Sequence, residues 1–217
     1  MNRDIVQELS YGLLLRANYD NLLFGTTKLV KLLYLIDCEY FRWNRRTLTQ
    51  ANWIFYHYGP YAAELIDVIN AAPGVSVQPE VELEDGRSFR EYKLKWFRED
   101  PISRMHFSTR GVVESVYKQW GASDLALLLD HVYYETPPML AAVRSQGLDF
   151  SLIPDPKEAG SSDIVRDFSV MIPDTKRRAL KQRLKQSAAN YRVRRNPISL
   201  EIDENDEAAF QAMGGRD

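Results

Sequence analysis

The sequence predicts a protein of the α+β class that is mainly helical and carries one small β-hairpin. Two observations support this prediction. Apolar residues recur at helical spacing through most of residues 4–145, and alternating apolar segments flank a single Asp85-Gly86 pair. Apolar side chains every three or four residues share one side of a helix, whereas a period of two is typical of a strand. We therefore expect a compact helical domain followed by a helical C-terminal extension.

The chain has 217 residues, enough for one domain with a sizeable core plus an extension. The predicted boundaries are 1–147 for the helical domain, 148–173 for a loop-rich linker and 174–217 for a charged extension. Within the extension, residues 176–195 hold nine basic residues and no acid, whereas residues 201–207 hold five acids. We expect a basic helix that docks by a narrow apolar seam and is followed by an acidic strip.

Two helices are predicted at the N-terminus. Residues 4–17 have an apolar residue at every fourth position. Gly25-Thr26-Thr27 then supplies a break and an N-cap for a second helix that runs to about Tyr40. On this helix Asp37 projects into the apolar sector, where a carboxylate needs a partner or its pKa rises. We interpret Asp37 as a structural acid bonded to residues 53–61, with a catalytic acid as the alternative.

The segment 53–61 is the most unusual stretch of the sequence, because six aromatic rings, with His57 counted, fall within nine residues. Gly59 permits a sharp turn and Pro60 fixes the backbone that follows, so the preceding rings are held in place. A helix is then predicted over 61–71, with Pro60 at or just before its first turn.

The rings of this segment are expected to divide between core and surface. We assign Trp53 and Phe55 to the core, and alternation then directs Tyr56 and Tyr58 the other way. Rigid aromatic side chains give a large contact area at low entropic cost, which suits a protein-binding surface.

Asp85-Gly86 is a type I′ turn signal and predicts a hairpin over about 75–97. Pairing outward from this turn sets Val77 opposite Leu94. Pro79 can donate no ladder hydrogen bond, so its strand should lie at a sheet edge.

Three further helices are expected. Ser108 is predicted to cap a helix that stops at Gly121, and Ser123 to cap the next one. That helix should end at Thr136-Pro137-Pro138, which also begins a short helix closed near Gly147.

The sequence carries no metal or cofactor motif. His57, His106 and His131 lack metal-ligand spacing, and no phosphate-binding glycine motif occurs. The single cysteine, Cys38, excludes an intramolecular disulfide and a cysteine-rich zinc site. No apolar run approaches the length of a membrane span. We therefore expect no cofactor, no membrane association and a cytoplasmic protein.

Two alternatives to a purely protein-binding role stay open. One is an uncharacterised hydrolase built on Asp37, His57 and Glu64, although spacing indicates no nucleophile and base pair. The other is a DNA-binding regulator, in which a winged-helix-like hairpin with Lys93, Lys95 and Arg98, or the basic tail, contacts phosphates. The net charge of −2 does not favour nucleic acid.

Several segments resemble a known family. The run 27–37, Thr-Lys-Leu-Val-Lys-Leu-Leu-Tyr-Leu-Ile-Asp, and the run 56–61, Tyr-His-Tyr-Gly-Pro-Tyr, are similar to the Panacea domain of the SocA-like antitoxins of bacteria and phages. Tyr92-Lys93-Leu94 and the segment 134–139, Tyr-Glu-Thr-Pro-Pro-Met, follow in the family's order. The resemblance covers about residues 5–145.

The resemblance implies a mainly helical, non-enzymatic domain with a small β element, part of a toxin–antitoxin or phage-related system. It implies a small protein toxin as partner, neutralised by direct binding, and a protease or chaperone as a further partner. The expected partner-binding residues are Lys28, Lys31, Tyr34, Tyr56, His57, Tyr58, Gly59, Pro60 and Tyr61. The expected structural residues are Asp37, Trp53, Asp85 and Gly86.

Overall fold

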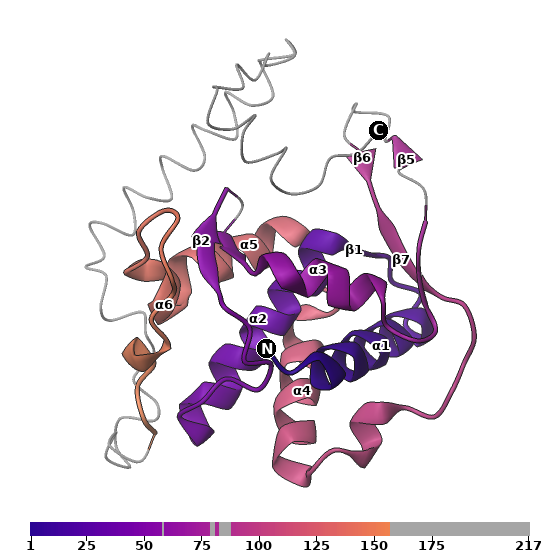
Figure 1. The fold of residues 1–217 in the computed structure, drawn as a ribbon, viewed down its shortest axis with the longest axis horizontal. Helices are drawn as coiled ribbons and strands as arrows, with labels where there is room; N and C mark the ends of the chain where they lie inside the picture. The colour runs from indigo at the N-terminus through magenta and orange to yellow at the C-terminus, as the bar shows by residue number, and fades with distance from the viewer. Residues whose placement is uncertain (58, 79–80, 83–87, 157–217) are drawn as a thin grey trace. The chain divides into compact units, whose positions relative to one another are not determined.

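The computed structural model describes residues 1–57, 59–78, 81–82 and 88–156, which lie within one compact unit, Met1–Val165. The predicted fold class is confirmed, because this part of the chain is mainly helical with small antiparallel sheets (Figure 1). Its α-helices are α1 (Arg3–Tyr19), α2 (Thr26–Asn44), α3 (Ala63–Asn70), α4 (Phe107–Trp120), α5 (Leu125–Glu135) and α6 (Pro137–Leu140). Two 3₁₀ turns, Pro101–Arg104 and Phe150–Leu152, complete the helical part.

Helix α2 is central to this fold and packs against α1, α4 and α5 (Figure 1). The predicted apolar face is buried, with Leu29, Leu33 and Ile36 fully enclosed. Gly25 occupies the N-cap of α2 and offers no side-chain hydrogen bond, whereas the sequence pattern indicates a threonine cap. Burial of a wide apolar surface, rather than capping, therefore stabilises this helix.

The predicted caps of α4 and α5 are wrong by one or two residues. His106 caps α4 in place of Ser108, and its ring accepts the hydrogen bond of the Ser108 amide. Asp124 caps α5 in place of Ser123, because the Asp124 carboxylate accepts the Ala126 amide. The Ser123 hydroxyl instead donates to the Trp120 carbonyl. Helix α6 ends at Leu140, well before the predicted end near Gly147.

The predicted hairpin over 75–97 is present as part of a three-stranded antiparallel sheet. Its strands are β1 (Phe24–Gly25), β7 (Glu91–Leu94) and β4 (Val75–Val77), in the order β1-β7-β4. Strand β1 was not predicted, because two residues are too few to show a period. Towards the tip, β5 (Val81–Glu82) pairs with β6 (Ser88–Phe89).

The predicted register of this hairpin is wrong by two residues. Val77 lies opposite Tyr92, not opposite Leu94. Because the register is shifted by an even number of residues, the side chains that were predicted to share one face of the hairpin still share it. Tyr92 also pairs with Phe24 on its other side, and its hydroxyl donates to Asn70 Oδ1 at 2.9 Å. These contacts from elsewhere in the chain bury Tyr92 and account for the observed register.

A second hairpin replaces the predicted start of the third helix. Strand β2 (Ile54–Tyr56) pairs with β3 (Gly59–Tyr61), with Phe55 opposite Pro60. Helix α3 therefore begins only at Ala63, and Pro60 lies in a strand rather than in a first helical turn. Strand β3 lies at the edge of its two-stranded sheet, a position that tolerates a residue without an amide hydrogen.

Several predicted features lie outside the described residues. They are the turn Asp85-Gly86, the edge residue Pro79, the ring of Tyr58 and the charged extension 174–217. Among the helices that the structure describes, none is long and apolar enough to cross a membrane.

Candidate functional site

Strands β2 and β3 and the residues that join them form what we call the aromatic hairpin. The ring of Tyr56 lies 5.6 Å from that of Tyr61 and 4.3 Å from that of His57, measured between centroids. Tyr56 and Tyr61 are half-buried and His57 is exposed. Three of the predicted partner-binding side chains therefore lie together at the surface.

Asp37 holds the base of the aromatic hairpin from inside the fold. It is fully buried, and its carboxylate accepts the Thr49 amide at 2.8 Å, the Thr49 hydroxyl and the Trp53 indole N–H at 2.7 Å. Burial raises the pKa of this carboxyl, and the hydrogen bonds from Thr49 and Trp53 oppose that rise. The prediction that Asp37 is buried and bonded to the segment 53–61 is confirmed.

Lys31 lies beneath the aromatic hairpin rather than on its surface. Its side chain is buried, and Nζ donates a hydrogen bond of 2.9 Å to the carbonyl oxygen of Pro60. Burial lowers the pKa of this lysine to about 8, because the charged form loses hydration. Lys31 thus anchors strand β3 to α2.

The two other candidates on α2 are also engaged within the fold. Lys28 is half-buried, and its Nζ donates a hydrogen bond of 2.7 Å to the Ser123 carbonyl oxygen. Tyr34 is fully buried and shares a hydrogen bond of 3.0 Å with the Thr136 hydroxyl. The ring of Tyr34 also packs edge-on against Trp53, at 5.4 Å between centroids. In this conformation the Tyr34 side chain cannot reach a partner.

Helix α5 supports the turn of the aromatic hairpin through Tyr133. Gly59 has a φ of +92°, and a Cβ at this position would lie 3.1 Å from the Tyr133 ring. The same ring packs edge-on against Phe55, at 6.2 Å between centroids. Glycine is therefore required at position 59 both by its backbone angle and by the close approach of α5.

The outer edge of β2 pairs with residues 145–148, a contact that the sequence did not predict. The Phe55 amide donates to the Gln146 carbonyl at 3.0 Å, and the Ser145 amide donates to the Phe55 carbonyl at 2.7 Å. Leu148 donates in the same way to Trp53 at 2.8 Å. Strand β2 thus has backbone partners on both edges, and its rings are held by main-chain hydrogen bonds.

Arg144 adds a cation next to the exposed rings. Its guanidinium donates to Nδ1 of His57, because an arginine side chain carries no acceptor. The neighbouring Val143 and the nearby Leu140 of α6 are 56% and 57% exposed. Apolar and cationic surface therefore borders the hairpin on this side.

Carboxylates lie on the opposite flank, beside Tyr61. Partial burial raises the pKa of the Tyr61 hydroxyl, and the nearby Asp67, Tyr56 and Glu64 raise it further. Glu64 accepts the Asn52 amide at 3.4 Å. Asp37 and Glu64 make no hydrogen bond to His57 within the described structure, so the three side chains of the hydrolase alternative are not assembled as a set.

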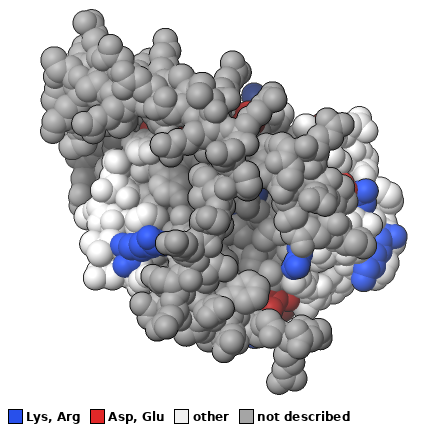
Figure 2. All heavy atoms as spheres, turned by 90° about the horizontal axis from the view of Figure 1, so that it is seen from above, with Lys and Arg blue, Asp and Glu red and all other residues white. Residues whose placement is uncertain are grey.

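The basic residues of the alternative DNA-binding surface are dispersed. Lys93 forms an ion pair of 2.9 Å with Glu91, and the Arg98 guanidinium lies 4.4 Å from the centre of the Tyr11 ring. Figure 2 shows Lys and Arg side chains of the described residues at separate places on one face of the molecule.

Comparison with known families gives one match. The family described as "Antitoxin SocA-like, Panacea domain" matches residues 29–137, half of the chain. The matched range includes most of α2, the aromatic hairpin and α5. Comparison with curated proteins and with solved structures gives no match.

Proposed function

The chain belongs to the SocA-like antitoxin family with its Panacea domain, and from this premise we propose that it neutralises a small protein toxin by direct binding through the aromatic hairpin. The observation that carries the proposal is a set of surface rings, Tyr56, His57 and Tyr61, held by the main chain on both edges of β2. Tyr58 joins them as a candidate from the sequence.

The rigidity of the aromatic hairpin supports this role. Gly59 lies against the Tyr133 ring, Lys31 bonds to Pro60, and Trp53 bonds to buried Asp37. Rings that are already fixed lose little conformational entropy when a partner covers them, so more of the contact energy appears as affinity. Buried aromatic anchors dominate many protein interfaces for this reason.

The surroundings of the rings indicate the chemistry of the partner. Val143 and Leu140 offer apolar area beside Arg144, whereas Glu64 and Asp67 lie near Tyr61. A toxin surface with an apolar centre, an acidic group on one side and a basic group on the other would complement this arrangement. Lys28, half-buried next to α5, contributes charge at the margin.

In this proposal the protein acts by binding and not by catalysis. Asp37, the only one of the three hydrolase candidates that is fully buried, is occupied by Thr49 and Trp53. A protease or chaperone would act on the bound toxin as a further partner. Co-expression with the toxin distinguishes neutralisation by binding alone from delivery of the toxin to a protease. Binding alone leaves the cellular level of the toxin unchanged, whereas delivery to a protease lowers it.

The test begins with the toxin, sought as a growth-inhibiting product of a neighbouring gene that the wild-type chain neutralises on co-expression. Truncating an aromatic anchor costs about 2 kcal/mol, so Tyr56→Ala and Tyr58→Ala should each raise the Kd by about thirtyfold. Tyr19→Ala is the matched control, because Tyr19 is an exposed tyrosine on α1.

Thermal unfolding of each variant accompanies the binding measurement. The aromatic variants should lose rescue at a temperature at which their melting curves show that they are still folded. If Tyr56→Ala, Tyr58→Ala and Tyr61→Ala all rescue growth as well as Tyr19→Ala does, the toxin binds elsewhere and the proposed surface is wrong.

A further inference from the structure

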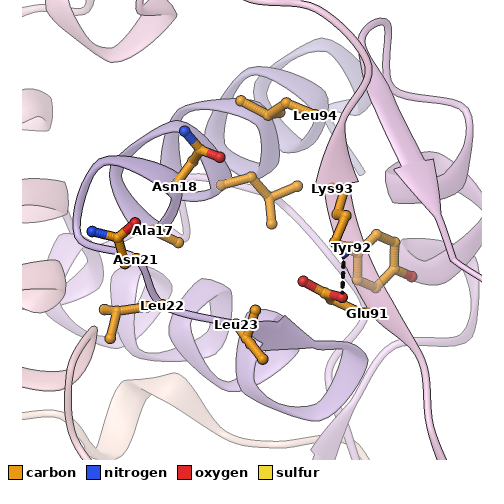
Figure 3. Close-up of a pocket in the computed structure, with 10 residues that line it drawn as sticks. Ala17, Asn18, Asn21, Leu22, Leu23, Glu91, Tyr92, Lys93 and Leu94 are labelled. Atoms are coloured by element: carbon orange, nitrogen blue, oxygen red, sulfur yellow. Dashed lines mark ion pairs between the residues drawn. The ribbon is translucent and has the colours of Figure 1, made fainter. Parts of the chain in front are cut away.

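A second surface feature lies away from the aromatic hairpin and shares none of its residues. It is a groove of about 290 Å³ between the C-terminal half of α1 and strand β7 (Figure 3). Leu14, Ala17 and Leu22 give it an apolar floor, and Leu94 closes it on the β7 side. The ring of Tyr92 points away from the groove and into the fold.

The backbone of β7 is open along this groove. Strand β1 pairs only with Glu91 and Tyr92, so β7 continues beyond it through Lys93 and Leu94. The Gln78 amide donates to the Glu91 carbonyl, and the Lys95 amide donates to the Gly74 carbonyl. The backbone N–H and C=O groups of the odd-numbered residues in this segment therefore point towards β4. Since backbone groups alternate along a strand, the N–H and C=O of Leu94 point into the groove. Within the described residues no hydrogen bond to these two groups is found on that side.

The opposite wall carries two side-chain amides. Asn18 and Asn21 line the groove on the α1 side (Figure 3), and no side-chain hydrogen bond of either is found among the described residues. An amide group offers both donors and an acceptor, the combination needed to bind the N–H and C=O of an extended chain. The groove thus presents backbone-binding groups on two sides above an apolar floor.

The charge next to this edge is predominantly positive. Lys93 on β7 and Lys95 just after it are exposed, and Lys93 forms an ion pair of 2.9 Å with Glu91, the one carboxylate of β7. A strand that pairs with β7 would place alternate side chains beside these lysines. Opposite charges at such cross-strand positions stabilise pairing, and like charges oppose it.

We propose that this groove binds an extended segment of a partner protein as a strand added to β7. The segment carries apolar residues at alternate positions, which enter the floor formed by Leu14, Ala17 and Leu22. Acidic residues between them face Lys93 and Lys95. Strand addition of this kind takes affinity from main-chain hydrogen bonds and specificity from the alternating side chains.

The test uses the full chain and two blocked peptides, Ser-Val-Glu-Val-Glu-Val-Ser and its counterpart with both glutamates replaced by lysine. Hydrogen exchange at the Leu94 amide is the readout, because that group is predicted to become bonded. At a concentration ten times the Kd, the acidic peptide should slow exchange at Leu94 about tenfold. The lysine peptide should have a markedly smaller effect.

Two variants locate the effect. Lys93→Ala should reduce the preference for the acidic peptide, whereas Lys118→Ala, an exposed lysine on α4 outside the groove, should leave it unchanged. Asn18→Ala should weaken both peptides alike, because it removes a backbone contact and no charge. Melting curves of the variants verify that each is folded.

Three results would overturn the proposal. The first is unchanged exchange at Leu94 with the acidic peptide at millimolar concentration. The second is an equal response to both peptides in the wild type. The third is salt-dependent binding of duplex DNA that protects Leu94 and is lost in Lys93→Ala, since this would assign the edge to nucleic acid. The variants of the aromatic hairpin do not touch this groove, so the two proposals fail independently.

Discussion

At the scale of single residues, Asp37 is a buried polar side chain whose loss we expect to destabilise the fold. Asp37→Ala leaves the Thr49 and Trp53 donors buried without an acceptor. Such a loss costs about 1–3 kcal/mol in the free energy of unfolding. Urea melts should show this decrease, whereas Asp130→Ala, at an exposed position on α5, should change stability by less than about 0.5 kcal/mol. If Asp37→Ala lowers the free energy of unfolding by only a few tenths of a kcal/mol, the structural role of Asp37 is contradicted.

Lys31 should make stability depend on pH in the alkaline range. Its pKa is about 8 in the folded protein against 10.5 in the unfolded chain, so the unfolded chain binds more protons between these values. The free energy of unfolding should therefore rise with pH from about 8 to about 10.5. Lys31→Met removes this titration and should flatten the rise, as measured by urea melts at several pH values. An equally steep rise in Lys31→Met would assign the effect to another group.

The burial of Asp37 follows from helical spacing, but the burial of Lys31 does not. Lys31 lies roughly opposite the face formed by Leu29, Leu33 and Ile36, where a lysine on an ordinary surface helix meets water. Helix α2 is enclosed by other helices and by the aromatic hairpin, so its second face is buried too. That enclosure depends on Pro60, distant in sequence, which periodicity along α2 cannot reveal.

At the scale of elements, the turn of the aromatic hairpin should depend on Gly59. Gly59→Ala strains a backbone with φ +92° and forces a Cβ against the Tyr133 ring. Strain of this type costs about 1–3 kcal/mol. We expect toxin binding and rescue to fall although every aromatic ring is still present. Rescue equal to that of the wild type would show that the turn tolerates other conformations.

The matched control for this glycine is Gly111, which lies exposed inside α4, where an added Cβ would meet nothing within 4 Å. Gly111→Ala should raise the free energy of unfolding by about 0.5–1 kcal/mol, because alanine has the higher helix propensity. The two substitutions should change the free energy of unfolding in opposite directions when both are measured by the same denaturant method. That difference would distinguish local strain at Gly59 from a general effect of the added methyl group.

The helices were easier to predict than the aromatic hairpin for a physical reason. Long helices repeat their apolar pattern several times, as α1 and α2 do, whereas β2 and β3 have three residues each. Three residues give too little pattern to distinguish a strand from the start of a helix. The partner of β2 at residues 145–148 is also about ninety positions away in sequence, beyond any local signal.

At the scale of the whole molecule, the support of the aromatic hairpin extends beyond the part that defines the family. The family match ends at residue 137, yet residues 145–148 pair with β2. Phe150 packs against Tyr34 and Phe41, with centroids 5.9 and 5.8 Å apart. Arg45 then donates to the Ile153 carbonyl at 2.7 Å. The segment that was predicted to be a linker from residue 148 therefore begins as part of the core.

Truncation of the chain tests this extension of the core. A chain of residues 1–147, cut at the predicted domain boundary, lacks Phe150 and the bond from the Leu148 amide to Trp53, whereas a chain of residues 1–165 keeps both. Loss of one buried phenylalanine side chain costs about 3–5 kcal/mol, so the shorter chain should be less stable by at least about 3 kcal/mol. Urea melts of the two chains measure the difference, and Phe150→Ala in the full chain should reproduce most of it. Equal stability of the two truncated chains would mean that residues 148–165 only cover a core that is complete without them, and the aromatic hairpin would then be held by α2 and α5 alone.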